Sequence, residues 1–149
     1  MKKIFYLIFI SLIILTLSGC GNKTELTQED FKNYALNNNL SLDNTGNLYS
    51  ENANVVSFIN AYNDSIAFTF YICSNNEAAK YMFKDIKSNE DGIEKNKEMY
   101  TNLFNYNKYS YSNDNMYYSI IRVGKTLLMT NTSSQNEENA KNIIKELGY

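Results

Sequence analysis

The fold of this chain is constrained most by two stretches rich in β-branched and aromatic residues, residues 55–73 and residues 106–132. Residues 55–62 and 65–73 predict two strands joined by the tight Asn63-Asp64 connection. Three more strands are predicted at residues 106–112, 115–123 and 125–132, with Gly124 in the last connection, where a type II′ turn needs glycine. Strands joined by such short hairpins are antiparallel. The two stretches therefore predict an antiparallel sheet.

Three helix-start signals lie before, between and after these strands. Each pairs a hydroxyl N-cap with an acidic residue three positions later: Thr27 and Asp30, Ser74 and Glu77, Ser134 and Glu137. A weaker helix is predicted in the later half of residues 88–104. The predicted order is therefore α-β-β-α-(α)-β-β-β-α. This order indicates the α+β class, with an antiparallel sheet of about five strands packed on one face by helices.

The first twenty residues carry a targeting pattern. Lys2 and Lys3 precede an apolar run at residues 4–17. The run has the length of a secretory signal and is shorter than the roughly 20 residues that a membrane-spanning helix needs. It ends in Leu-Ser-Gly-Cys at residues 17–20. We therefore expect a signal peptide at residues 1–19.

The Leu-Ser-Gly-Cys sequence behind such a run closely resembles the lipobox of bacterial lipoprotein signals. This resemblance implies that Cys20 becomes the lipidated first residue, with a lipid anchor that includes palmitate. Residues 20–25 are then a short lipidated tether, and residues 26–149 form a single α+β domain. Dual acylation gives stable attachment where one chain would not. The resemblance thus implies a location on the extracytoplasmic face of the cell membrane.

Three further segments carry a second resemblance. They are residues 118–129 with Arg-Val-Gly-Lys-Thr-Leu, the closing Ile-Ile-Lys-Glu-Leu-Gly-Tyr and the opening Leu-Thr-x-Glu-Asp-Phe. Together with the lipobox, these segments look like small uncharacterised lipoproteins of low-GC Gram-positive bacteria. The excess of Asn, Lys, Ile, Tyr and Phe agrees with the codon bias of an AT-rich genome. The resemblance supports location and fold, and it implies no catalytic residues.

Several kinds of chemistry are excluded by what the sequence lacks. The chain has no histidine, which excludes Ser-His-Asp and Cys-His catalysis and His-containing metal sites. Its 14 basic and 16 acidic residues disfavour nucleic-acid binding, which requires a basic face. We therefore expect no catalytic residue, no metal site, no cofactor and no nucleic-acid partner. With Cys20 lipidated, Cys73 has no cysteine to pair with and is expected to be buried.

Tyrosines cluster on two predicted neighbouring strands, and they are the candidate binding residues. Tyr109, Tyr111 and Tyr118 are interpreted as an exposed contact platform, because a tyrosine ring gives large contact area and keeps a polar hydroxyl. The alternative is that they occupy half-buried strand positions. Arg122, the only arginine, is an interface anchor if exposed and needs an acidic partner if buried.

A basic stripe on the second predicted helix has two interpretations as well. Lys80, Lys84 and Lys87 recur at helical spacing. They are interpreted as a solvated helix face, and contact with anionic lipid headgroups is the alternative.

These observations favour a membrane-anchored extracytoplasmic lipoprotein that acts as a non-catalytic protein- or peptide-binding module. Its expected partners are the membrane, through the lipid at Cys20, and an envelope protein or extracellular peptide. One alternative is a receptor for a small ligand or glycan. Another is an inhibitor or immunity protein against a secreted enzyme or toxin.

Overall fold

The structure is a computed structural model, and it describes residues 23–43 and 54–149. Three α-helices and a short 3₁₀ turn alternate with strands in these ranges. The helical elements are α2 (Gln28–Asn37), α3 (Asn76–Asn89), η1 (Ser134–Asn136) and α4 (Glu137–Glu146). The strands are β1 (Ser41–Asp43), β2 (Val55–Tyr62), β3 (Ala67–Cys73), β4 (Lys97–Asn102), β5 (Tyr106–Ser112), β6 (Met116–Val123) and β7 (Thr126–Ser133).

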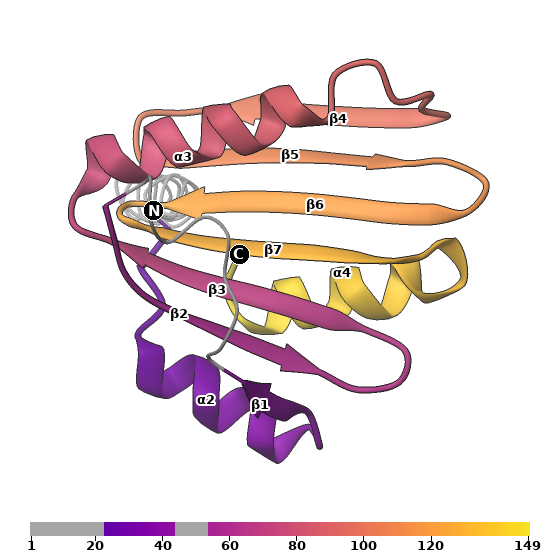
Figure 1. Cartoon of the computed structure of the whole chain (residues 1–149). Coiled ribbons are helices and arrows are strands. Elements are labelled where there is room, and N and C mark those ends of the chain that lie inside the picture. Colours follow the sequence, from indigo (N-terminus) through magenta and orange to yellow (C-terminus); the bar gives the residue numbers. More distant parts are fainter. Residues whose placement is uncertain (1–22, 44–53) are drawn as a thin grey trace, which may run out of the picture.

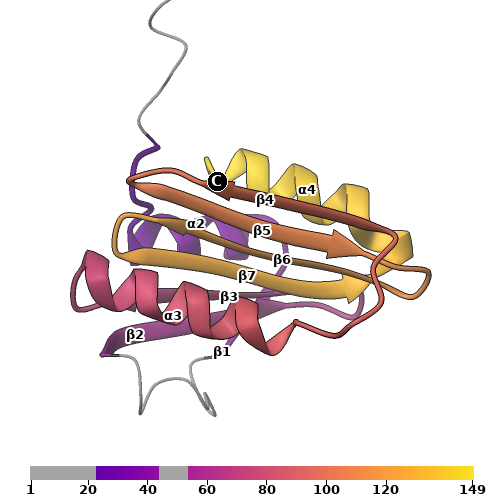
Figure 2. The same cartoon turned by 90° about the horizontal axis from the view of Figure 1, so that it is seen from above.

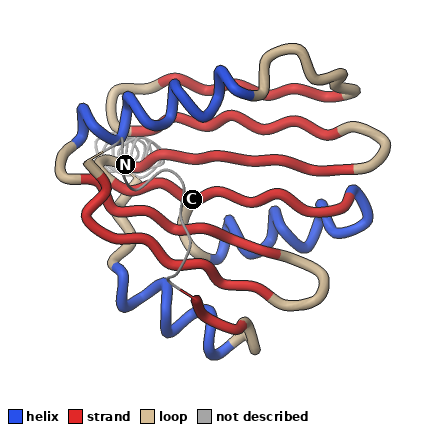
Figure 3. Tube along the Cα trace, viewed as in Figure 1, coloured by secondary structure: helices blue, strands red, loops and turns tan. Residues whose placement is uncertain are grey.

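All seven strands belong to one antiparallel sheet, in the spatial order β1-β2-β3-β7-β6-β5-β4 (Figure 1). Strands β1 to β3 pair in chain order, and so do β4 to β7, with α3 between the two groups in the chain. Figure 3 shows the strands in red and the helices in blue. The two groups meet where β3 pairs with β7, for example Phe68 with Thr130. This pairing joins segments about sixty residues apart and makes a single sheet of the two groups.

Helices cover both faces of the sheet (Figure 2). On one face, α2 and α4 bury residues such as Phe31 and Ile144 against Phe68, Phe70 and Ile121. On the other face, α3 alone buries its apolar stripe, which consists of Ala78, Ala79, Met82, Phe83 and Ile86. We call these the α2/α4 face and the α3 face. The domain thus has two cores separated by the sheet.

The predicted fold was wrong in three respects: the number of strands, the element order and the placement of the helices on one face. The weak helix expected within residues 88–104 is instead the outer strand β4. Met99 and Leu103 are four residues apart, as on one face of a helix, yet both are exposed in this extended segment. The additional strand β1 has three residues, too few to show an alternating pattern.

The predicted helix starts agree with the structure to within a few residues. Thr27 is the N-cap of α2, and its hydroxyl accepts from the backbone N–H of Asp30 as predicted. The cap of α3 is Asn75, one residue after the predicted Ser74, because the Asn75 side chain accepts from the Ala78 N–H. Ser134 begins the 3₁₀ turn that leads into α4. The three helices exist as predicted, with the N-caps of the later two displaced by one and two residues.

Strand β3 is buried on both sides. Phe68 and Phe70 face the α2/α4 core, and Tyr71 and Cys73 belong to the α3 core. The Cys73 thiol is buried, and burial raises its pKa to about 11. The thiol therefore stays protonated and unreactive at neutral pH.

Candidate binding groove beside strand β4

The three tyrosines proposed as a contact platform are core residues. Tyr109, Tyr111 and Tyr118 are 0%, 2% and 3% exposed. They lie under α3 with their rings 5.2–6.4 Å apart. The Tyr111 hydroxyl donates to Glu90 at 2.6 Å. The pKa of this hydroxyl is raised mainly by burial and to a smaller extent by the hydrogen bond. The exposed interpretation was wrong because α3 covers this part of the sheet, and the rings are buried more deeply than the half-buried alternative predicts.

Arg122 is also fully buried, at 0% exposed. It donates from Nε to the Asn107 side-chain oxygen at 2.6 Å, and from Nη1 and Nη2 to the carbonyls of Gly124 and Phe104 at 2.6 and 3.1 Å. Among the described residues it has no carboxylate within ion-pair distance. The expected acidic partner is thus replaced by neutral oxygens. Burial lowers the pKa of Arg122, and the more distant Glu77 and Glu25 oppose this.

The bonds of Arg122 fix the hairpin between β4 and β5. Its partner Asn107 donates in turn to the Asn102 side chain across the hairpin at 2.6 Å, and its partner Phe104 lies at the tip. A buried guanidinium bound to rigid acceptors loses little freedom per bond. The tip therefore holds Leu103 and Phe104 outward on a braced loop, where they are 60% and 90% exposed.

A groove of about 360 Å³ lies between α3 and this hairpin. Its apolar wall is formed by Phe83, Tyr100, Leu103 and Phe104. Its polar groups are Lys80, Lys84, Asn102 and Asn107, and no carboxylate lines it. Lys80 Nζ lies 5.4 Å from the centre of the Phe104 ring and is paired with Glu77 at 2.8 Å. The groove thus combines aromatic surface with positive charge.

Strand β4 is the outer strand at this edge of the sheet (Figure 1). Leu103 and Tyr106 exchange two backbone hydrogen bonds at the hairpin end. Because inward and outward groups alternate along an antiparallel strand, the bonds to β5 come from Leu103, Thr101 and Met99. The N–H and C=O groups of Glu98, Tyr100 and Asn102 consequently point away from the sheet.

Exposed apolar side chains concentrate near this edge. Six of the nine large hydrophobic side chains that are exposed in the described residues lie between residues 76 and 104, namely Tyr81, Ile93, Met99, Tyr100, Leu103 and Phe104. Isolated exposed apolar residues are normal, whereas a cluster marks an interaction surface. Sequence reasoning missed this surface because residues 97–104 were interpreted as a helix.

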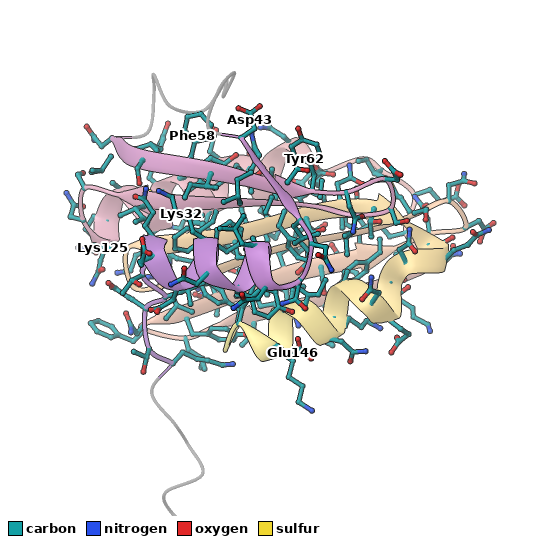
Figure 4. The ribbon with its side chains drawn as sticks, turned by 90° about the horizontal axis from the view of Figure 1, so that it is seen from below. Lys32, Asp43, Phe58, Tyr62, Lys125 and Glu146 are labelled. Atoms are coloured by element: carbon teal, nitrogen blue, oxygen red, sulfur yellow. The ribbon has the colours of Figure 1, made fainter. Side chains whose placement is uncertain are left out.

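A second, smaller groove of about 220 Å³ lies on the α2/α4 face, between α2 and the β1 edge. Lys32 and Asp43 place both signs of charge in its lining, which also includes Gln28, Leu42 and Ile59. Figure 4 shows this face, with Lys32 on α2 and Glu146 on α4. The Tyr34 hydroxyl donates to Glu146 at 2.6 Å and ties the two helices together. This groove has neither the exposed aromatic wall nor the uniform charge of the first.

The predicted signal peptide and Cys20 lie outside the described residues. Within residues 23–43 and 54–149, no helix has the length and apolarity needed to cross a membrane. The same ranges contain no group of three or more metal-binding side chains.

The fold and the groove define an α+β domain with a seven-stranded antiparallel sheet, helices on both faces and an outer strand β4 that pairs on one side only among the described residues. No family model matches the chain, and neither a curated protein nor a solved structure shows significant similarity to it.

Proposed function

We propose that the protein is a lipid-anchored, extracytoplasmic binding module without catalytic function, and that it binds a segment of an envelope protein or an extracellular peptide along β4. The observation that carries this proposal is the open edge of β4. Its outward backbone groups at Glu98, Tyr100 and Asn102 lie beside exposed apolar side chains.

An extended peptide can add to such an edge as an eighth strand. Backbone hydrogen bonds to the edge supply affinity, and pockets for alternate side chains supply specificity. Every second side chain of the added strand would lie on the α3 face, beside Tyr100 and the groove. Natural sheets normally protect long edges, because an unprotected edge pairs with other chains. A six-residue outer strand with Met99 and Tyr100 about half exposed is therefore suited to a partner.

Site-specific photocrosslinking in the intact envelope tests the proposal. A benzophenone amino acid replaces Met99, which is 56% exposed on β4. The matched control places it at Leu36, which is 59% exposed on α2. We expect a discrete crosslinked protein or peptide from position 99 and none from position 36. Equal or absent crosslinking at both positions would contradict a partner at β4.

Proline substitutions separate strand addition from simple surface contact. Tyr100→Pro removes an outward N–H and should abolish the crosslink at position 99, because proline cannot donate to an added strand. Tyr100→Ala keeps this N–H and should retain part of the crosslink. A partner that tolerates Tyr100→Pro as well as Tyr100→Ala binds in some other way.

The groove itself favours a second candidate function, a receptor for a small ligand. Its volume of about 360 Å³ falls within the range of roughly 300–1,000 Å³ typical of ligand sites. Its aromatic and amide side chains could hold a glycan or another small anionic or polar molecule. A thermal-shift screen of glycans and metabolites, compared between the wild type and Asn102→Ala, tests this alternative.

A further inference from the structure

The described chain begins at one particular end of the sheet. Lys23 Nζ lies 5.6 Å from the centre of the Tyr106 ring, and the Glu25 carboxylate accepts from the Lys125 N–H at 2.9 Å. Gly124 permits this crossing, because a Cβ there would collide with the Glu25 carboxylate, and its φ of +55° suits glycine. Figure 2 shows the first described residues beside the connection between β4 and β5. The N-terminal segment is thus fastened to this end of the sheet.

The exposed hairpin tip lies at the same end. Leu103 and Tyr106 are hydrogen-bonded neighbours, so the tip is adjacent to the ring that Lys23 contacts. The Gly124 N–H also donates to the Asn105 carbonyl at 3.0 Å. Leu103 and Phe104 therefore project from the end of the domain at which the tether joins it.

Lysines lie near the tip, and one of them, Lys80, is paired with Glu77. Lys80 contacts the Phe104 ring and Lys84 lines the groove beside it. Lys84 forms no ion pair among the described residues, and Lys125 is exposed at the neighbouring turn. Exposed aromatic and aliphatic side chains flanked by lysines are typical of surfaces that lie in an anionic membrane interface.

The length of the tether brings this surface to the membrane. From Cys20 to Lys23 the chain advances three residues, which span at most about 11 Å when fully extended. A lipid on Cys20 would therefore hold the Tyr106 end of the sheet within about one tether length of the headgroups. This end of the sheet then lies nearest the bilayer.

We propose that Leu103 and Phe104 enter the interface of an anionic bilayer while Lys80 and Lys84 contact its headgroups. This inference rests on the proposed lipid anchor, and it goes further by assigning an orientation to the domain. Arg122 and Asn107 are positioning residues, because their hydrogen bonds hold the hairpin tip. The outward backbone groups of β4 run away from the tip toward Lys97, so they stay accessible to a partner.

The absence of tryptophan from the chain provides the test. Phe104→Trp introduces a single indole at the tip. The matched control is Tyr62→Trp, at an aromatic position 44% exposed near the opposite end of the sheet. The full chain, purified from membranes with its native processing, is reconstituted into vesicles of brominated phosphatidylcholine containing one quarter phosphatidylglycerol. We expect quenching at position 104 to exceed that at position 62 by about threefold or more, because only the tip enters the interface.

A second set of measurements, in which charge is removed from the lipid or from the protein, tests the role of the lysines. Vesicles without phosphatidylglycerol, or Lys80→Gln with Lys84→Gln, should lower the quenching at position 104 by about half, since each surface lysine adds attraction to anionic lipid. Quenching that is unaffected by both changes would overturn the assignment of the headgroup contact.

Two other outcomes would separate this inference from the proposed function. If the protein is recovered from membranes but the indole at position 104 is not quenched, the docking surface is wrong and the lipid anchor stands. An indole that is shielded from aqueous acrylamide and not quenched by brominated lipid would place a protein segment, and not the bilayer, on the tip. A chain that is not retained in membranes at all would overturn both proposals.

Discussion

The two faces of the sheet are covered in different ways. On the α2/α4 face, two helices close over a core of aliphatic and phenylalanine side chains, with Phe31 stacked on Phe70 at 5.0 Å. On the α3 face, a single helix lies over tyrosines and a buried arginine, and a groove remains beside it. In the second core, Arg122 and Tyr111 form specific hydrogen bonds.

The difference between the two faces indicates that the α2/α4 face stabilises the fold and that the edge of the α3 face serves binding. A face closed by two helices is a continuous apolar core, which stabilises the fold in proportion to its buried area. A face closed by one helix leaves the outer strand and the hairpin tip open, and its arginine braces the open part. We therefore expect substitutions on the first face to act on folding, and substitutions at the open edge of the second face to act on binding.

The largest effect is expected on the α2/α4 face. Phe70→Ala removes a ring that is 1% exposed and should lower the free energy of unfolding by about 4 kcal/mol, as for other buried phenylalanines. Urea denaturation followed by circular dichroism measures this. A loss below about 1 kcal/mol would mean that this core collapses around the cavity and is less rigid than its packing indicates.

A somewhat smaller effect is expected on the α3 face from Arg122→Met. The change removes the buried charge but leaves the Asn107 side chain and two carbonyls without their donor, at a cost of about 3 kcal/mol. Hydrogen exchange should increase most at residues 103–107, because these bonds brace the hairpin. Uniform exchange throughout the sheet would show that Arg122 supports the whole core and has no special role at the tip.

The stability of the protein at alkaline pH provides a second test of the α2/α4 face. Tyr149 is 5% exposed, and burial raises the pKa of its hydroxyl. An unfolded tyrosine ionises near pH 10. The unfolded state therefore releases its proton first as the pH rises. The stability associated with Tyr149 is complete below pH 10 and is lost above it, by about 1 kcal/mol at pH 11. Tyr149→Phe should weaken this loss in denaturation at pH 9, 10 and 11, and Tyr81→Phe on exposed α3 surface is the control.

The smallest effect on stability is expected at the hairpin tip. Phe104 is 90% exposed, so Phe104→Ser should change the free energy of unfolding by less than about 0.5 kcal/mol, as for most surface substitutions. The same change should reduce membrane contact if the tip lies in the interface. A large loss of stability would contradict the division between the stabilising face and the open edge.

Local signals in the sequence identified most of the elements. The Thr27 cap and the positive φ of Gly124, which is +55°, depend on a few neighbouring residues, and both were predictable. The spans of β2 and β5 agree with the predicted residues 55–62 and 106–112, because their β-branched and aromatic residues are bounded by clear turn residues.

Features that depend on distant segments could not be predicted in this way. The burial of Tyr109 follows from the position of α3, which no pattern around residue 109 reveals. The hydrogen bonds of Arg122 to Phe104 and Gly124 join separate turns. The groove exists because one helix covers less of the sheet than two, and this depends on the spatial order of the strands.

That strand order has a consequence for how the chain acquires its structure. β3 lies between β2 and β7, and β7 is the last strand to emerge as the chain is made from its N-terminus. Until then, one side of β3 remains without its partner, while β4 to β6 can assemble through local hairpins. Because pairing of distant segments is slow, the seam between β3 and β7 is expected to close last. The pairing at the centre of the finished sheet is thus the last to form, and nascent chains are most open to misassociation there.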